Sequence, residues 1–197
     1  PAPTPEARRA AMLAKTGGFI QSKAEGPALL FLNAQTRVPA NVIKAPVEQI
    51  SKSLRLSAVQ RDSPNAAEPI KAALEALQDK DVAAVVVVGD TAEYPSLLIA
   101  PESRWALVNV AALGSKGVSA ETLADRINKE IWRAFGYLMG AAHSNFEACL
   151  MKPVLTPADL DALKVKGMSP EPFNKIMTHA QKLGMQPQRM TTYRKAV

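Results

Sequence analysis

The residues best placed to do chemistry in this chain lie close together, between Arg133 and Met151. Gly140 and His143 are three residues apart and follow a stretch with helical periodicity. A histidine at this distance from a glycine that ends a helix can turn back and complete a zinc site begun on that helix. Zinc hydrolases of this kind place two further histidines four residues apart on the helix, with a glutamate beside the first as general base.

The helix positions that should carry these groups hold Arg133, Ala134 and Tyr137 instead. A guanidinium group only donates hydrogen bonds and stays charged, so Arg133 would repel a metal cation. Ala134 has no group that accepts a proton, and Tyr137 would have to lose a proton with a pKa of about 10. With these residue types at the helix positions, we expect no catalytic residue, no metal and no other cofactor here.

This stretch resembles the active-site helix and Met-turn of the metzincin zinc proteases, H-E-x-x-H-x-x-G-x-x-H followed by a methionine. Gly140 and His143 match the pattern, whereas Arg133, Ala134 and Tyr137 replace its first His, its Glu and its second His. Met151 follows at a distance typical of matrixin-like and archaemetzincin-like members, in which this residue lies beneath the metal without binding it. The resemblance implies a metzincin-like fold in a degenerate, inactive member.

Cys149 is the only cysteine, so no disulfide can form within the chain. It matches a cysteine that archaemetzincin-like members place near the Met-turn, where further cysteines help to bind a second zinc ion. Those further cysteines are absent here, so we expect a buried, inert thiol.

Two interpretations of Arg133 are open. In the first, Arg133, Tyr137 and His143 converge, and the guanidinium supplies a fixed positive charge near the place of the lost metal. In the second, Arg133 extends to solvent along its aliphatic stem. An alternative function also follows from these residues, a peptidase with an unorthodox metal site that uses His143 together with His179 or Glu130.

Alternating and apolar stretches predict the strands of an α/β sheet. Val82–Val88 is apolar on both faces and should be central. Leu97–Ala100 and Trp105–Leu113 flank a turn and should form a hairpin at an antiparallel edge. The other expected strands are Phe19–Ser22, Ala28–Asn33 and Leu54–Arg61.

Helical spacing and capping residues predict the helices. Ser119–Met139 is the longest, with Ser119 as N-cap and Gly140 just past its end. Val42–Ser53 contains Pro46, which suits a first turn and predicts the true start there. The other expected helices are Glu6–Lys15, Pro69–Gln78, a short one after Thr156 and one from Ser169 to about residue 183.

This order of elements predicts an α/β, metzincin-like fold with a mixed twisted sheet, two backing helices, the long active-site-type helix, the Met-turn and a small helical C-terminal subdomain. We expect one compact domain, in which residues 1–17 form an arm, 18–143 the upper subdomain and 144–197 the Met-turn and helical part. The strand between the hairpin turn and the long helix should be the edge that accepts an extended peptide. Its candidate contact residues are Trp105, Leu107, Val108, Asn109 and Val110.

Composition narrows the classes of function and partner that remain open. Of the 197 residues, 47% are hydrophobic and 21% are charged, and no apolar run approaches the ~20 residues that cross a bilayer. The net charge of +6 favours an acidic partner, but the cations look scattered and no base-stacking motif accompanies them, so a nucleic-acid binder is only a further alternative. We predict a binding or scaffold domain with a protein or peptide partner. The Pro-rich start without an initiator Met favours an exported bacterial protein.

Overall fold

A five-stranded, mostly parallel sheet organises the computed structural model, which describes residues 4–8, 18–21, 23–114, 117–147, 149–164 and 167–193. The strand order is β3-β2-β4-β6-β5, and only β5 is antiparallel to its neighbour. Every residue of β4 is buried, as the valine run predicts for a central strand. The strands are β2 (Ala28–Ala34), β3 (Ala58–Asp62), β4 (Val82–Gly89), β5 (Leu97–Ala100) and β6 (Trp105–Asn109).

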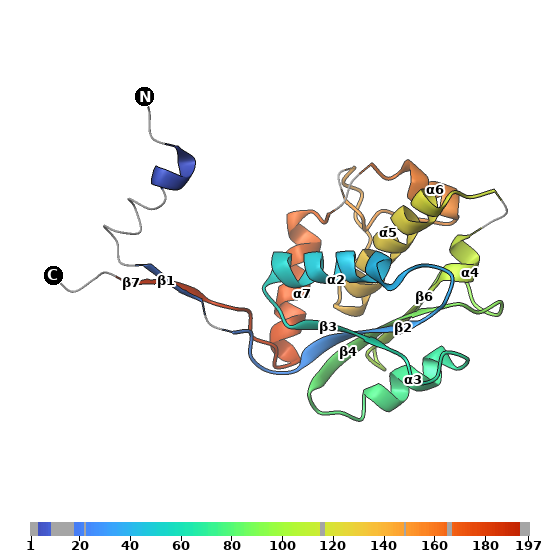
Figure 1. Ribbon diagram of the computed structural model, residues 1–197, viewed down its shortest axis with the longest axis horizontal. Coiled ribbons are helices and arrows are strands. Elements are labelled where there is room, and N and C mark those ends of the chain that lie inside the picture. The colour runs from blue at the N-terminus through green and yellow to red at the C-terminus, as the bar shows by residue number, and fades with distance from the viewer. Residues whose placement is uncertain are drawn as a thin grey trace.

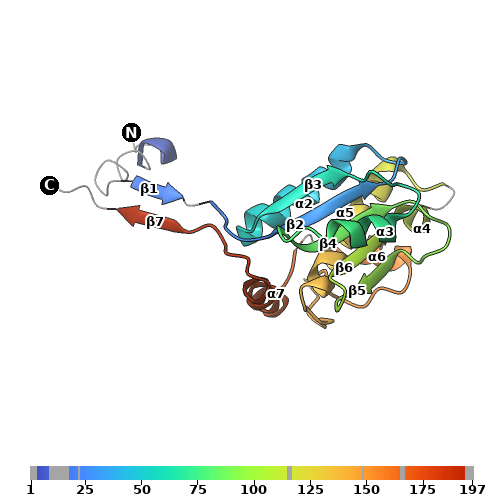
Figure 2. The ribbon, with the colours of Figure 1, turned by 90° about the horizontal axis from the view of Figure 1, so that it is seen from below.

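Helices cover both faces of this sheet (Figures 1 and 2). On one face, α2 (Ala40–Leu54) packs over β2, whose Leu29 and Phe31 belong to the core on this side, and α5 (Ala120–Leu138) lies against α2 and packs over β4, β5 and β6. On the other face, α3 (Pro69–Ala76) packs over Leu30 and Leu32. The alternation of side chains along β2 thus fills two separate cores, because successive residues of a strand point to opposite faces.

The start of α2 differs from its prediction. The helix begins at Ala40 rather than at Pro46, which lies buried inside it. Proline lacks one helical hydrogen bond there, but the apolar side that contains Ile43, Val47 and Ile50 is buried along its whole length, and this packing outweighs the local loss.

Two predicted strands are shorter than expected. The segment predicted as a strand from Leu54 begins as a strand only at Ala58, because α2 continues through Leu54 and ends where Arg55 takes a left-handed backbone conformation with φ of 58°. The strand predicted as Trp105–Leu113 ends at Asn109, where the Asn109 side chain caps a short helix, α4 (Val110–Leu113).

The predicted hairpin is confirmed, but its edge was assigned to the wrong strand. β5 and β6 pair antiparallel across the turn at 101–104, and β6 also pairs in parallel with β4. β6 is therefore an inner strand, and β5 forms the edge of the sheet. The periodicity shows that two strands pair but does not show which of them meets the central strand.

The part of the chain after α5 contains α6 (Pro157–Ala162) and α7 (Pro170–Lys182), as predicted. A capping box between Thr156 and Asp159 starts α6. At the end of α5, Gly140 has φ of 82°, the left-handed conformation that glycine adopts at least cost. Among the described residues, no helix is both long and apolar enough to cross a membrane.

Two short strands, one near each end of the chain, form a separate ribbon. β1 (Gly18–Gln21) pairs antiparallel with β7 (Met190–Tyr193) and projects away from the sheet and its helices (Figures 1 and 2). β1 confirms the strand predicted at Phe19–Ser22, whereas β7 was not predicted. Residues 5–8 are helical, and most of the helix predicted at Glu6–Lys15 lies outside the described residues.

Candidate functional site

The long helix α5 positions most of the motif residues that the sequence singles out. The Ser119 hydroxyl accepts a hydrogen bond from the Thr122 amide and so caps its first turn, as predicted. Its apolar side is buried over the sheet, and Ala134, at the place of the general base, is fully buried within that core. The opposite side of α5 carries charged residues that are also buried, so this helix is covered on both sides.

Arg133 is one of these buried charges, with only 3% of its surface exposed. Its Nε donates to Glu130 Oε2 at 3.0 Å. Its Nη1 donates to the carbonyl oxygens of Leu150 at 2.7 Å and Lys152 at 2.5 Å, on either side of Met151. The interpretation that Arg133 extends to solvent is therefore wrong, since the guanidinium joins α5 to the turn that contains Met151.

Glu130 supplies the counter-charge. Its side chain is 1% exposed and accepts a hydrogen bond from the Ser96 hydroxyl at 3.4 Å, in addition to that from Arg133. Burial raises the pKa of the Glu130 carboxyl, while the charge and the hydrogen bond of Arg133 act in the opposite direction. A buried ion pair of this kind is costly to break, because either partner alone would be an uncompensated charge.

Tyr137 and His143 complete the cluster, as the first interpretation of Arg133 predicts. The Tyr137 hydroxyl and His143 Nδ1 are 2.9 Å apart, and Arg133 Nη2 lies 3.5 Å from that hydroxyl. Burial raises the pKa of Tyr137, so its hydroxyl stays protonated at neutral pH. His143 is exposed, which makes it the solvent-facing end of the chain of contacts from Glu130 to His143.

Met151 is part of the core and packs against α5. It is fully buried, and a Cβ atom added at Gly136 would come within 2.7 Å of its Sδ atom. Gly136 therefore lets the turn approach the helix closely. The neighbouring Cys149 is also buried, and its Sγ accepts hydrogen bonds from the amide and hydroxyl of Ser169 at 3.4 and 3.3 Å. The expected buried thiol is confirmed.

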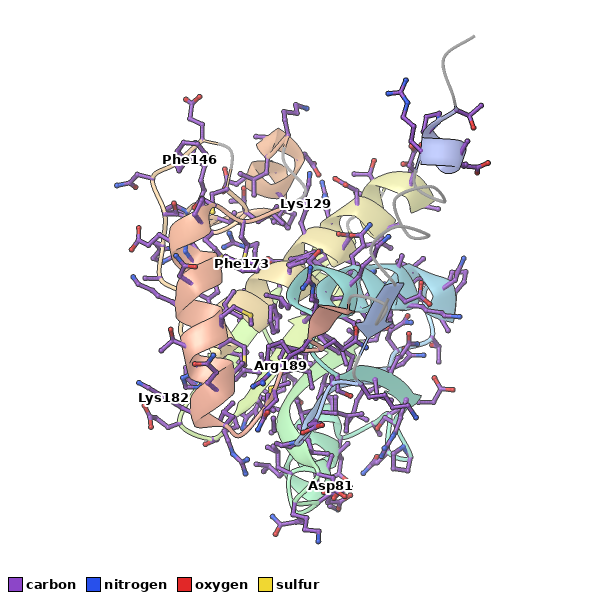
Figure 3. All side chains as sticks on the ribbon, turned by 90° about the vertical axis from the view of Figure 1, so that its left-hand side faces the viewer. Asp81, Lys129, Phe146, Phe173, Lys182 and Arg189 are labelled. Atoms are coloured by element: carbon purple, nitrogen blue, oxygen red, sulfur yellow. The ribbon has the colours of Figure 1, made fainter. Side chains whose placement is uncertain are left out.

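Two further cations on α5 hold the segments beside this helix. The Arg126 guanidinium pairs with both carboxylate oxygens of Asp161, at 2.9 and 2.6 Å, and donates to the Leu113 carbonyl at 2.7 Å. Lys129 donates to the Leu160 carbonyl at 2.8 Å and is only 5% exposed (Figure 3). Sequence reasoning missed both, although their spacing from Arg133 by whole turns places all three cations on one side of the helix.

The contact between Arg126 and Asp161 should make the docking of α6 sensitive to acid. The hydrogen bonds from Arg126 lower the pKa of Asp161. Because the folded-state pKa lies below the ordinary value of about 3.9, this carboxylate adds stability above that value and loses it as the pH falls through the folded-state pKa. We expect Asp161→Asn to reduce the loss of stability between about pH 6 and pH 2.5, measured as urea midpoints.

The matched control is Asp81→Asn, which removes an exposed carboxylate from the turn before β4. The urea midpoint of Asp81→Asn should fall between about pH 6 and pH 2.5 by nearly as much as that of the unaltered chain. Equal reductions in both variants would contradict a specific role for Asp161.

The ligands considered for an unorthodox metal site are not brought together. Both oxygens of Glu130 already accept hydrogen bonds, from Arg133 and Ser96. His179 lies on α7 beside the end of α5, where a Cβ added at Gly140 would be 3.7 Å from its Nδ1. In the parts of the chain that the structure describes, no group of three His, Cys, Asp or Glu side chains is arranged to hold a metal ion.

The five residues predicted to form a peptide-binding edge lie on the inner strand β6 and at the start of α4. Leu107, Val108 and Val110 are fully buried, while Trp105 is partly exposed at the start of β6. Asn109 is fully buried and holds the loop before β5, since its amide donates to the carbonyls of Thr91 and Tyr94 at 2.8 and 2.5 Å. These residues are part of the sheet core and do not form an open edge.

No protein-family model and no curated protein matches the sequence. Solved structures do match the fold. Archaemetzincin from Methanopyrus kandleri has a TM-score of 0.62 at 15% identity, with 79% of this chain and 96% of that chain covered. A zinc-dependent peptidase from Methanocorpusculum labreanum has 0.59 at 19%, covering 76% and 99%.

A third match is archaemetzincin from Archaeoglobus fulgidus, solved with malonate, with a TM-score of 0.53 at 14% identity over 75% of this chain and 99% of that one. At these identities the likeness concerns the fold. The chain therefore has an archaemetzincin-like α/β fold, with Arg133, Tyr137 and His143 gathered where the long helix meets the turn that contains Met151.

Proposed function

We propose that this chain is a non-catalytic, metzincin-like binding domain in which Arg133 has replaced the metal as the link between the long helix and the Met-turn. The observation that carries this proposal is the buried guanidinium, which joins Glu130 to the carbonyls of Leu150 and Lys152. A bound metal ion joins two elements because ligand atoms on each donate lone pairs to it. A guanidinium group joins two elements by donating hydrogen bonds to acceptor atoms on each.

The residues of the cluster do not fit a zinc ion. Zinc needs lone pairs, and the guanidinium offers none while adding a positive charge. Tyr137 is held protonated by burial, which leaves His143 as the one residue of the motif whose type ligates zinc. Ala134 cannot remove a proton from water and is enclosed by the core. Neither metal activation of water nor general-base catalysis has the groups it requires at this place.

The binding role rests on the edge of the sheet that the degenerate cluster adjoins. β5 pairs on one side with β6 and is the last strand in the sheet order. Ser96, which contacts Glu130, directly precedes β5. An extended peptide that adds to β5 would gain main-chain hydrogen bonds and lie beside the cluster, with no group there to cleave it.

The experiment that tests this proposal is elemental analysis of protein purified without chelator, together with a peptide-hydrolysis assay. We expect less than about 0.1 equivalent of zinc, iron or nickel, and no hydrolysis above the rate without protein. About one equivalent of metal retained through dialysis, with hydrolysis abolished by His143→Ala, would support the alternative of an unorthodox peptidase instead.

A further inference from the structure

The outer side of β3 is a free edge of the sheet. β3 is the first strand in the sheet order, and among the described strands it pairs only with β2 (Figure 2). The amide of Leu29 donates to the carbonyl of Ser57 at 2.9 Å, and at the other end the amide of Ser63 donates to β2 at 2.8 Å. Because alternate residues in a parallel ladder direct both backbone groups to the same neighbour, the odd-numbered residues of β3 bond to β2. The residues whose amides and carbonyls point outward are Ala58, Gln60 and Asp62.

The side chains of β3 alternate between the two faces of the sheet. Gln60 lies on the face that α2 covers, since its Nε2 donates to the carbonyl of Ala40 at the start of α2, at 3.4 Å. Asp62 is two residues further along the strand and so lies on the same face. Val59 and Arg61 lie on the opposite face, and both are exposed.

A groove of about 430 Å³ lies between this edge and α2. Val47 and Ala58 contribute apolar surface to it, and Lys44 and Glu48 line it as an exposed pair with 3.6 Å between Nζ and Oε1. Gln60 also lines the groove, and its buried Oε1 accepts no hydrogen bond from the described residues. A buried acceptor without a donor costs free energy, so an occupant that supplies a donor here would be stabilised.

We propose that the β3 edge and this groove bind the β3 strand of a second copy of this chain, so that the two sheets join across a twofold axis at Gln60. An edge strand with free amides and carbonyls is a template for such pairing. In an antiparallel pair centred on Gln60, the outward-facing residues form the hydrogen-bonded pairs, with Gln60 opposite itself and Ala58 opposite Asp62. This register uses the outward backbone groups of β3 and leaves its ladder with β2 intact.

The charges of the edge are complementary to each other in this register. Asp62 of one copy lies opposite Ala58 of the other, and Ala58 lines the groove together with Lys44. Twofold symmetry therefore brings Asp62 of each copy to Lys44 of the other, which makes two ion pairs. Asp62 Oδ1 accepts from Asn33 at 2.9 Å, so Oδ2 is the oxygen that would receive the lysine. The present pair of Lys44 with Glu48 is exposed and weak, and so does not hold the lysine in place.

The same register matches the remaining groups at the edge. The two Gln60 side chains meet at the axis, where Nε2 of each copy can donate to Oε1 of the other. On the opposite face Arg61 lies opposite Val59, and its aliphatic stem covers a side chain that is 36% exposed in the single chain. Because α2 contacts both β2 and β3, the two copies of α2 become antiparallel neighbours on one face of the joined sheet. β5 stays free at the far edge, so this inference does not rest on the peptide proposed there.

The first test is analytical ultracentrifugation of the full chain from about 1 to 100 µM. We expect reversible association to about 42 kDa, twice the 21.1 kDa of one chain, and no larger species, because a twofold interface closes. Gln60→Pro should weaken association at least about tenfold, since proline removes the outward amide at the axis and spares the ladder with β2. Urea midpoints establish that the variant is folded. The mass of a single chain at every concentration, growth beyond two copies, or an unaffected Gln60→Pro dimer would each overturn the proposal.

A charge exchange tests the register without proline. Lys44→Glu and Asp62→Lys should each weaken association at least about tenfold, since each sets like charges against one another at both ion pairs. An equimolar mixture of the two variants should associate within about threefold of the unaltered chain, because each altered position then meets an opposite charge on the other chain. The matched controls are Lys71→Glu and Asp81→Lys, which reverse exposed charges away from β3 and should leave association within about threefold. A mixture that associates no better than its separate variants, or controls that lose as much, would refute this interface.

Discussion

Arg133→Ala is expected to lower the free energy of unfolding by about 3–5 kcal/mol, the cost of leaving one partner of a buried ion pair unmatched. Glu130 would lose its counter-charge at a position where 1% of the side chain is exposed. The carbonyls of Leu150 and Lys152 would lose their donor as well. Urea unfolding at neutral pH measures the loss, with the slope of the transition as a check that unfolding remains cooperative.

A second variant separates charge burial from packing. Glu130→Gln/Arg133→Met removes both charges and keeps similar side-chain length, and replacement of a whole buried pair by neutral groups is often nearly neutral. It should recover a large part of the stability that Arg133→Ala loses. Surface Arg37, paired with Asp90 at 2.6 Å and 53% exposed, provides the matched control, since Arg37→Ala should cost about 1 kcal/mol or less. A similar cost for Arg133→Ala would refute its role as a link.

Arg133→His/Tyr137→His is expected to create a zinc site on α5. The two substitutions place histidines four residues apart on α5, with His143 retained beyond Gly140. Three histidines leave an open fourth position, as in catalytic zinc sites, while Ala134 remains in the core. We expect zinc at about 100 times its Kd to stabilise this variant by ~2.7 kcal/mol and to leave the unaltered chain unchanged.

The controls for the zinc site remove one ligand at a time. Arg133→His alone, and the double variant with His143→Ala added, should bind zinc far more weakly, since each lacks at least one of the three histidines. The zinc-dependent shift in the thermal midpoint and the bound metal after dialysis are measured for each. A folded double variant without a stoichiometric site would show that residues 133, 137 and 143 do not stand where three ligands converge.

Several features of the fold could be predicted because they depend on local patterns. The valine run of β4 was expected to be central and is buried throughout. Ser119 and Gly140 were expected at the ends of the long helix and are found there. The start of α2 was mispredicted because the rule for proline in a first turn is local, whereas the burial that keeps Pro46 inside the helix is tertiary.

In the candidate site, too, some features follow from local sequence patterns and others depend on tertiary contacts. Of the two interpretations that the sequence leaves open for Arg133, the one in which Arg133, Tyr137 and His143 converge agrees with the structure, since helical spacing and the turn after Gly140 bring them together. The sequence does not predict that Glu130 neutralises Arg133, or that Arg126 and Lys129 hold other segments to the same helix. The acceptors for these donors are mainly backbone carbonyls, which every residue carries and no residue type reveals.

The sequence by itself determined the main helices and strands and the residue types that stand at the motif positions, Arg133, Ala134 and Tyr137. Tertiary structure alone decided that β6 is an inner strand, that Arg133 is buried against the turn around Met151, and that β1 near one end of the chain pairs with β7 near the other. The physical reason is distance along the chain. Periodicity and caps act within a few turns, whereas strand order, buried ion pairs and paired termini depend on which remote segments meet.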